Sequence, residues 1–180
     1  MALITLQGGR TKMPKKKTIS KSKAKANAWR EFSRFIRTRD AIATTGDTDN
    51  LVCCTCSKLI PFKQAQAGHF IAGRTNALLF DEDIVHGQCY ACNVCNHGEQ
   101  LEYYYYMKRH YSEEQILEMR KLRYQTVKYT AEDLDNIAEE YKKKTEELLR
   151  VFKLYGLYDE KTQRLLRPPR LLDNHTVFMM

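Results

Sequence analysis

Four cysteines stand in two pairs whose spacing is typical of zinc sites. Cys53 and Cys56 form one Cys-x-x-Cys turn, and Cys89 and Cys92 form a second. Such a turn presents two thiolates to one ion, and two turns complete a tetrahedral site. The spacing therefore predicts a structural Zn²⁺ ion held by these four cysteines, with a long insertion between the turns. The alternative without a metal is a set of unpaired, buried cysteines.

Two further cysteines leave the ligand set open. Cys95 forms a competing Cys-x-x-Cys pair with Cys92, whereas Cys54 cannot easily share the turn of its neighbour Cys53. Disulfides are not expected, because the N-terminal segment has no apolar stretch after its positive charges that would act as a secretory signal. No apolar run is long enough to cross a membrane either.

A histidine inside the insertion and two residues after it could carry out phosphodiester hydrolysis. A neutral imidazole, with an ordinary pKa of about 6.5, can take a proton from water at physiological pH, so His69 is the candidate general base. If a helix begins at Asn93, that residue and His97 share one face and could hold a divalent ion. The expected ion is Mg²⁺ or Mn²⁺, which would stabilise the charge on the phosphate and on the leaving oxygen.

Each of these residues also has a purely structural interpretation. A single histidine near a glycine is more often a surface or core residue, Asn93 could be only a helix N-cap, and His97 could lie on a helix surface. The chain would then be a non-catalytic zinc protein that binds DNA, or a zinc-bearing transcriptional regulator. The combination of paired cysteines with His69, Asn93 and His97 favours an enzyme.

Basic residues are concentrated at the N-terminus. The net charge is +8, and the first thirty residues hold nine lysines and arginines and no acid. Residues 1–26 are expected to form a flexible arm that binds DNA phosphates, or alternatively a solvated tail. The candidate DNA-binding residues come from this arm and from one face of the helix that follows: Lys15, Lys16, Lys17, Arg30, Arg34 and Arg37.

Apolar residues at helical spacing predict the helices that must position these groups. They cover residues 27–40, residues 93–110 with a bend at Gly98, residues 113–122, and a longest helix over about residues 130–152. The last two begin at capping residues, Ser112 with Gln115 and Thr130 with Asp133.

Shorter segments connect these helices. Residues 51–72 contain the first cysteine turn and then a strand, residues 73–83 are expected to form a loop, and residues 85–88 lead into the second turn. Four tyrosines at 103–106 are expected to pack mainly in the core with one or two exposed rings, which could instead stack on unpaired bases. Residues 158–180 are expected to form a loose tail.

The whole pattern resembles that of the HNH nucleases and, more narrowly, that of the NinG (Rap) family of lambdoid phage recombination endonucleases. The resemblance covers about residues 27–150 and includes neither the basic arm nor the tail. The segments that carry it are Phe35-Ile36-Arg37-Thr38-Arg39-Asp40, Cys53-x-x-Cys56, Ala67-Gly68-His69-Phe70, Phe80-Asp81-Glu82, His86-Gly87-Gln88-Cys89-x-x-Cys92-Asn93 and Tyr129-Thr130-Ala131-Glu132-Asp133.

The resemblance implies an α+β fold in which a four-cysteine zinc knuckle braces a ββα-metal (HNH, His-Me finger) centre surrounded by helices, within a nuclease domain over residues 27–157. It also implies a structure-specific endonuclease that cleaves branched DNA, such as Holliday junctions and D-loops, in the cytoplasm of the phage host. His69 would be the base, and Asn93 would lie near the metal. The oligomeric state, including a homodimer, is left open.

Three positions depart from the family pattern. Gly68 stands where many HNH proteins have an acidic or histidine ligand directly before the base. Ile84 stands where the middle asparagine of the HNH pattern is expected, about five residues before the second cysteine turn. Asn76 is therefore the candidate substitute for orienting His69. Cys95 stands where the family's helix usually carries polar residues. The metal is therefore expected to have fewer protein ligands than usual.

Overall fold

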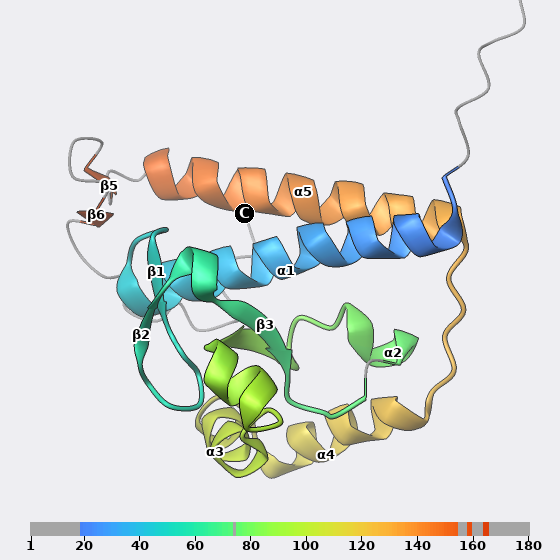
Figure 1. Cartoon of the computed structure of the whole chain (residues 1–180), viewed down its shortest axis with the longest axis horizontal. Coiled ribbons are helices and arrows are strands. Elements are labelled where there is room, and N and C mark those ends of the chain that lie inside the picture. The colour runs from blue at the N-terminus through green and yellow to red at the C-terminus, as the bar shows by residue number, and fades with distance from the viewer. Residues whose placement is uncertain (1–18, 74, 155–157, 160–163, 166–180) are drawn as a thin grey trace, which may run out of the picture.

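Two long helices lie side by side, and most of the other elements lie on one side of the pair (Figure 1). They are α1 (Lys21–Thr45) and α5 (Ala131–Leu154). The structure is a computed structural model, and it describes residues 19–73, 75–154, 158–159 and 164–165. No helix in these ranges is both long and apolar enough to cross a membrane.

Helix α1 begins earlier than the apolar spacing predicts. Ser20 caps it by accepting a hydrogen bond from the backbone N–H of Lys23, and Gly46 ends it with a left-handed φ of 69°. The predicted flexible arm, residues 1–26, is therefore wrong for residues 21–26, because Ala24 and Ala28 extend the buried face of the helix toward α5. The candidate lysines at 15–17 lie outside the described residues.

Helix α5 begins where its capping residues predict. The backbone N–H of Thr130 donates to Asp133 Oδ2 at 2.7 Å, and the N–H of Asp133 donates to Thr130 Oγ1 at 3.1 Å. Leu134 and Ala138 of α5 pack against Ala24 and Ala28 of α1. Farther along the helix, Tyr141 enters the main core, which also contains Phe32 and Phe35 of α1.

Three small antiparallel sheets complete the mixed α+β fold of the described residues. Strand β1 (Asn50–Val52) pairs with β2 (Leu59–Pro61). Strand β5 (Tyr158–Asp159) pairs with β6 (Arg164–Leu165), so the loose tail predicted over residues 158–180 contains a short strand pair, and its other residues lie outside the described ones. Strand β3 (Gln66–His69) pairs with β4 (Val85–Gln88) in a register that sets Gln66 opposite Gln88. The predicted strand before Phe70 is thus confirmed.

Short helices and turns complete the fold of the described residues, several of them on the other side of the β3–β4 hairpin from α1 (Figure 1). They are η1 (Phe62–Gln64), α2 (Asn76–Leu79), η2 (Ala91–Cys95), α3 (Gln100–His110), α4 (Glu113–Lys121) and η3 (Leu122–Tyr124). The capping box at the start of α4 is present as predicted. The loop predicted over residues 73–83 contains α2 instead, because Leu78 and Leu79 are buried.

The predicted helix over residues 93–110 is wrong in its first part. Residues 91–95 form the single π-helical turn η2, and the next residues turn left-handed, with φ of 53° at His97, 92° at Gly98 and 48° at Glu99. The turn is held because Gly98 donates its N–H to Cys92 O at 2.8 Å and accepts a hydrogen bond from Gln88 Nε2 at 3.0 Å. Helix α3 therefore begins only at Gln100.

Candidate functional site

The two cysteine pairs come together as their spacing predicts. The Sγ atoms of Cys53, Cys56, Cys89 and Cys92 all lie within 4.8 Å of one another, so these four cysteines could hold a zinc ion. The first pair lies in the turn between β1 and β2, and the second follows β4 directly. Cys95 is exposed and outside this cluster, which leaves it as a surface thiol.

Cys53 and Cys54 are adjacent in the sequence, but their surroundings shift the pKa values of their thiols in opposite directions. Burial opposes ionisation of Cys53, but N–H donors from Cys56 and Cys89 and the hydroxyl of Thr55 lower its pKa to about 6. Burial, and then the charge of Asp40, raise the pKa of Cys54 well above its ordinary value. Since the thiolate is the metal-binding form, Cys53 is suited to a metal and Cys54 to the core.

A hollow of about 290 Å³ lies between α1 and the β3 region, and we call it the α1–β3 hollow. From α1 it is lined by Trp29, Ser33 and Arg37, which are four residues apart and so share one helical face. The opposite wall consists of Ala65, Gln66, Ala67, His69 and Asn93. The structure therefore brings His69, Asn93 and Arg37 to one place.

His69 reaches this hollow at the end of β3, where it pairs with Val85 of β4. Its imidazole stacks on the indole of Trp29, with ring centroids 5.3 Å apart and an interplanar angle of 15°. The position of the imidazole is therefore fixed both by β3 and by Trp29 of α1. Trp29 is one of the apolar residues at helical spacing in this part of α1, and nothing in its spacing distinguishes it from a core residue.

Asn93 is placed by the second cysteine turn. Its backbone N–H donates to Cys89 O at 3.0 Å, and its side-chain Nδ2 donates to Gln66 Oε1 at 2.7 Å. His97, by contrast, is exposed on the left-handed turn and does not line the hollow. The expected shared face of Asn93 and His97 is wrong, because the helix that it requires is absent.

Asn76 is engaged elsewhere. Its Oδ1 accepts a hydrogen bond from Lys25 Nζ at 2.7 Å, and its Nδ2 donates to Val127 O at 2.8 Å. It does not line the α1–β3 hollow, so its suggested role in orienting His69 is not supported. Its side chain instead ties α2 to α1 and to the segment before α5.

Gly68, directly before the candidate base, is a glycine for a steric reason. A Cβ atom there would lie 1.9 Å from Gln88 Oε1 and 2.9 Å from Asn93 Oδ1. Gln88 is fully buried, and its Nε2 donates to Thr55 Oγ1 at 3.2 Å as well as to Gly98 O. Its Oε1 has no hydrogen-bond partner among the described residues. The sequence offers one sign that Gln88 has a special role: it is a polar residue in a buried strand, where polar residues are uncommon.

Arg37 carries an uncompensated charge into the hollow. Its Nε donates to Ser33 O at 3.0 Å, and its guanidinium lies 4.8 Å from the centre of the Phe62 ring. Among the described residues it forms no ion pair with a carboxylate, and burial, followed by the charge of Arg34, lowers its pKa. Arg30 instead pairs with Glu31 at 2.8 Å, and Arg34 is exposed.

A buried ion pair fixes β4 against α1. Asp40 Oδ2 accepts a hydrogen bond from the backbone N–H of Gly87 at 2.6 Å, and Asp40 Oδ1 accepts one from Arg39 Nε at 2.8 Å. Arg39 also donates to Val85 O at 3.0 Å. Burial opposes ionisation of Asp40, but Arg39 and His86 hold the pKa of that carboxyl well below its usual range. This ion pair thereby fixes the position of β4, the strand that contains Gln88.

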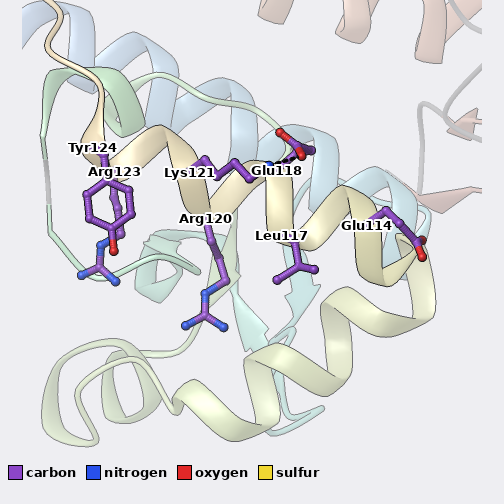
Figure 2. Close-up of a pocket in the computed structure, with 7 residues that line it drawn as sticks. All are labelled: Glu114, Leu117, Glu118, Arg120, Lys121, Arg123 and Tyr124. Atoms are coloured by element: carbon purple, nitrogen blue, oxygen red, sulfur yellow. Dashed lines mark hydrogen bonds and ion pairs between the residues drawn. The ribbon is translucent and has the colours of Figure 1, made fainter.

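A second hollow, of about 380 Å³, lies along α4 and η3, and we call it the α4 hollow. Figure 2 shows Arg120 and Arg123 extending on the same side of the helix as Tyr124, while Glu118 pairs with Lys121 at 2.5 Å. The Tyr124 side chain is 82% exposed. Neither histidine nor cysteine lines this hollow, whose charged lining combines Glu114 and Glu118 with the basic side chains.

Comparison with known proteins identifies one family. The model of the family described as Bacteriophage Lambda NinG protein matches residues 6–150, which is most of the chain and includes both hollows and the cysteine cluster. No curated protein and no solved structure matches the chain significantly.

Proposed function

Because the chain belongs to the bacteriophage lambda NinG protein family, we propose that it is a metal-dependent HNH-type endonuclease with a role in phage recombination. One observation carries the proposal: His69, Asn93 and an uncompensated Arg37 line the same hollow beside a four-cysteine cluster. A general base, an oxygen that can bind a divalent ion and a fixed positive charge can each assist hydrolysis of a phosphodiester.

The order of elements around the hollow supports a ββα-metal centre. Strands β3 and β4 form an antiparallel hairpin, and the chain then passes through the second cysteine turn into α3. Tyr103 of α3 donates its hydroxyl hydrogen to Gly68 O at 2.9 Å, so the helix is anchored on the hairpin next to the candidate base. A zinc ion bound by the cysteines would clamp both ends of this unit.

Each residue of the hollow has a specific role in the proposed reaction. His69 takes a proton from the attacking water, and Trp29 holds its ring in place. Arg37 binds a phosphate oxygen, since no carboxylate competes for its guanidinium. Asn93 lines the hollow, and its Oδ1 lies close to Gly68. A neutral oxygen of this kind is a ligand for a hard cation such as Mg²⁺ or Mn²⁺. Such an ion, when bound, stabilises negative charge on the phosphate.

The proposed substrate is branched DNA in the cytoplasm of the phage host. The α4 hollow offers it a second surface, because Arg120 and Arg123 form no ion pairs among the described residues and can bind phosphates. The exposed ring of Tyr124 can stack on an unpaired base, which D-loops and junctions with unpaired nucleotides present and continuous duplex does not.

The proposal is tested with His69→Ala and a matched His97→Ala control, both as the full-length, zinc-loaded chain. Cleavage of a Holliday junction is measured with Mn²⁺, along with zinc content and junction affinity. We expect His69→Ala to bind zinc and DNA but not to cut, whereas His97→Ala cuts as the wild type does, because His97 is exposed and outside the hollow. Wild-type cleavage by His69→Ala would show that another group is the base. A wild-type protein that binds but never cuts would be a recombination accessory.

A further inference from the structure

We propose that Phe62 is a positioning residue, which holds the guanidinium of Arg37 so that its Nη2 group binds a DNA phosphate in the α1–β3 hollow. This inference rests on the proposed function, in which Arg37 binds a phosphate oxygen. Phe62 belongs to the short helix η1 and is not among the residues that line the hollow. Its effect on DNA binding therefore passes through Arg37.

Three contacts hold the guanidinium of Arg37. Its Nε donates to Ser33 O at 3.0 Å, one turn earlier on the same helix. Its Nη1 donates to Phe62 O at 3.4 Å. The guanidinium carbon also lies 4.8 Å from the centre of the Phe62 ring, which is within the range of a cation–π contact. Phe62 thus supplies two of the three contacts from a segment 25 residues away in the sequence.

These contacts leave one nitrogen of the guanidinium available. All three nitrogens of an arginine carry donor hydrogens, and here Nε and Nη1 already use theirs on backbone carbonyls. Among the described residues, no acceptor takes a hydrogen bond from the Nη2 of Arg37. Arg37 itself lines the hollow, so this free group is the part of the cation that suits a phosphate oxygen.

Phe62 is itself firmly anchored. Its backbone N–H donates to Asp49 O at 2.7 Å, and its carbonyl also accepts a hydrogen bond from the N–H of Ala65 at 3.2 Å. Its half-buried ring packs against the core cluster that includes Leu51 and Cys53. A side chain that is already ordered loses less conformational freedom on binding, so an anchored Phe62 should make Arg37 a better phosphate ligand.

The surroundings of Arg37 fit a cation that awaits an anion. Burial, followed by the charge of Arg34, lowers the pKa of Arg37. The ring of Phe62 and the two backbone carbonyls compensate the charge only in part, because none of them carries a full negative charge. A phosphate supplies that charge. The alternative is that Phe62 and Arg37 simply pack together, and the experiment must separate the two cases.

The test is a double-mutant cycle on full-length, zinc-loaded protein that carries His69→Ala, so that the DNA stays intact. Phe62→Leu removes the ring face, Arg37→Gln removes the cation, and fluorescence anisotropy gives the affinity of each variant for a Holliday junction. We expect Phe62→Leu to weaken binding by about fivefold when Arg37 is present and to have no effect beside Arg37→Gln. Phe62→Tyr keeps the ring face and should restore binding.

Equal losses from Phe62→Leu with and without Arg37 would show that the ring acts only by packing and would overturn the inference. Nuclear magnetic resonance of protein with Phe62 intact covers the case in which Phe62→Leu fails to fold. Junction DNA should shift the Nη signals of Arg37 more than its Nε–H signal, because Nε stays bonded to Ser33 O. A larger shift at Nε–H would overturn the assignment of Nη2.

The two proposals fail in different ways. If the wild type cuts DNA while Phe62→Leu and Arg37→Gln show no coupling, only the positioning role of Phe62 is wrong. If the two substitutions are coupled in junction binding but the wild type never cuts, the proposed nuclease function is wrong and the positioning role stands.

Discussion

The imidazole of His69 and the indole of Trp29 are stacked, with their centroids 5.3 Å apart and their planes within 15° of parallel. His69 is the last residue of the short strand β3, whereas Trp29 belongs to the long helix α1. A rigid helix thereby restricts the ring of a residue that stands at a strand end, and the stack becomes the first contact to test.

Removing the aromatic face of Trp29 should impair cleavage more than binding. Trp29→Leu retains apolar bulk but loses the stack, and we expect cleavage of junction DNA to fall by about 10²-fold, the effect of a misplaced reacting group. Trp29→Phe should keep most of the activity. Single-turnover cleavage and junction affinity are measured together, with zinc content as the check on folding. Equal rates for Trp29→Leu and the wild type would show that the stack does not orient the base.

Arg37 should contribute to phosphate binding more than its neighbours on α1. Arg37→Gln should reduce the slope of log affinity against log salt by about 1, as expected when one phosphate contact is lost. Arg30→Gln is the control, because Arg30 already pairs with Glu31. Fluorescence anisotropy over a range of salt gives both slopes. Identical slopes for the two variants would contradict the special position of Arg37.

One zinc ion per chain should depend on four particular cysteines. Cys56→Ser and Cys92→Ser should lose zinc and several kcal/mol of stability, since metal binding in such sites contributes directly to folding. Cys95→Ser should retain both, because its thiol is exposed outside the cluster. Elemental analysis and thermal unfolding check this. Retention of zinc by Cys89→Ser together with its loss from Cys95→Ser would instead assign the competing pair of Cys92 and Cys95.

Asp40 should stabilise the fold in a pH-dependent way. The folded-state pKa of Asp40 is depressed below its unfolded value of about 3.9, so its contribution is present above about pH 4 and lost as the pH falls further. At neutral pH, Asp40→Asn should lower the free energy of unfolding by about 3–5 kcal/mol, because Arg39 is left without its partner. Urea unfolding of both proteins should show this difference shrinking near about pH 3. A difference that is independent of pH would exclude the ion pair as its cause.

Tyr124 should matter for branched DNA and not for continuous duplex. Removing one stacked ring weakens single-strand binding by about 1–3 kcal/mol in other proteins. Tyr124→Ala should therefore bind a junction with unpaired nucleotides less tightly while binding linear duplex as before. Tyr105→Ala is a suitable control, since that ring is also exposed but lies on α3, outside the α4 hollow. Equal losses on both DNAs would argue against stacking.

Local signals predicted several parts of the fold. The caps at Ser112 and Thr130 are present because each depends on contacts within a few residues. The four-cysteine cluster and the strand that ends at His69 are also present, and both had a short sequence pattern that marked them. The interrupted helix after Asn93 could not be predicted in this way. Its turn depends on a hydrogen bond from Gln88, whose position beside Gly98 is set by the pairing of β4 with β3.

The same reason limits prediction of the site. Trp29 and Arg37 lie on α1, where the sequence spacing indicates an apolar face but no binding site. They line a hollow only because β3 packs opposite them. Gln88 pairs with Gln66 and Gly68 pairs with His86, and it is this strand pairing that brings the Gln88 side chain against Gly68. His97 failed as a candidate because its position was derived from an ideal helix that the glycine turn interrupts.

Helix α1 runs without a break from Lys21 to Thr45, and Arg37 lies on its second half. At about 1.5 Å of rise per residue, Lys21 stands about 24 Å from Arg37, roughly the length of seven base pairs. If Arg37 holds the phosphate that is cut, the helix acts as a ruler between the incision and the lysines at its start. Duplex arms shorter than about seven base pairs would then gain nothing from those lysines, whatever their sequence.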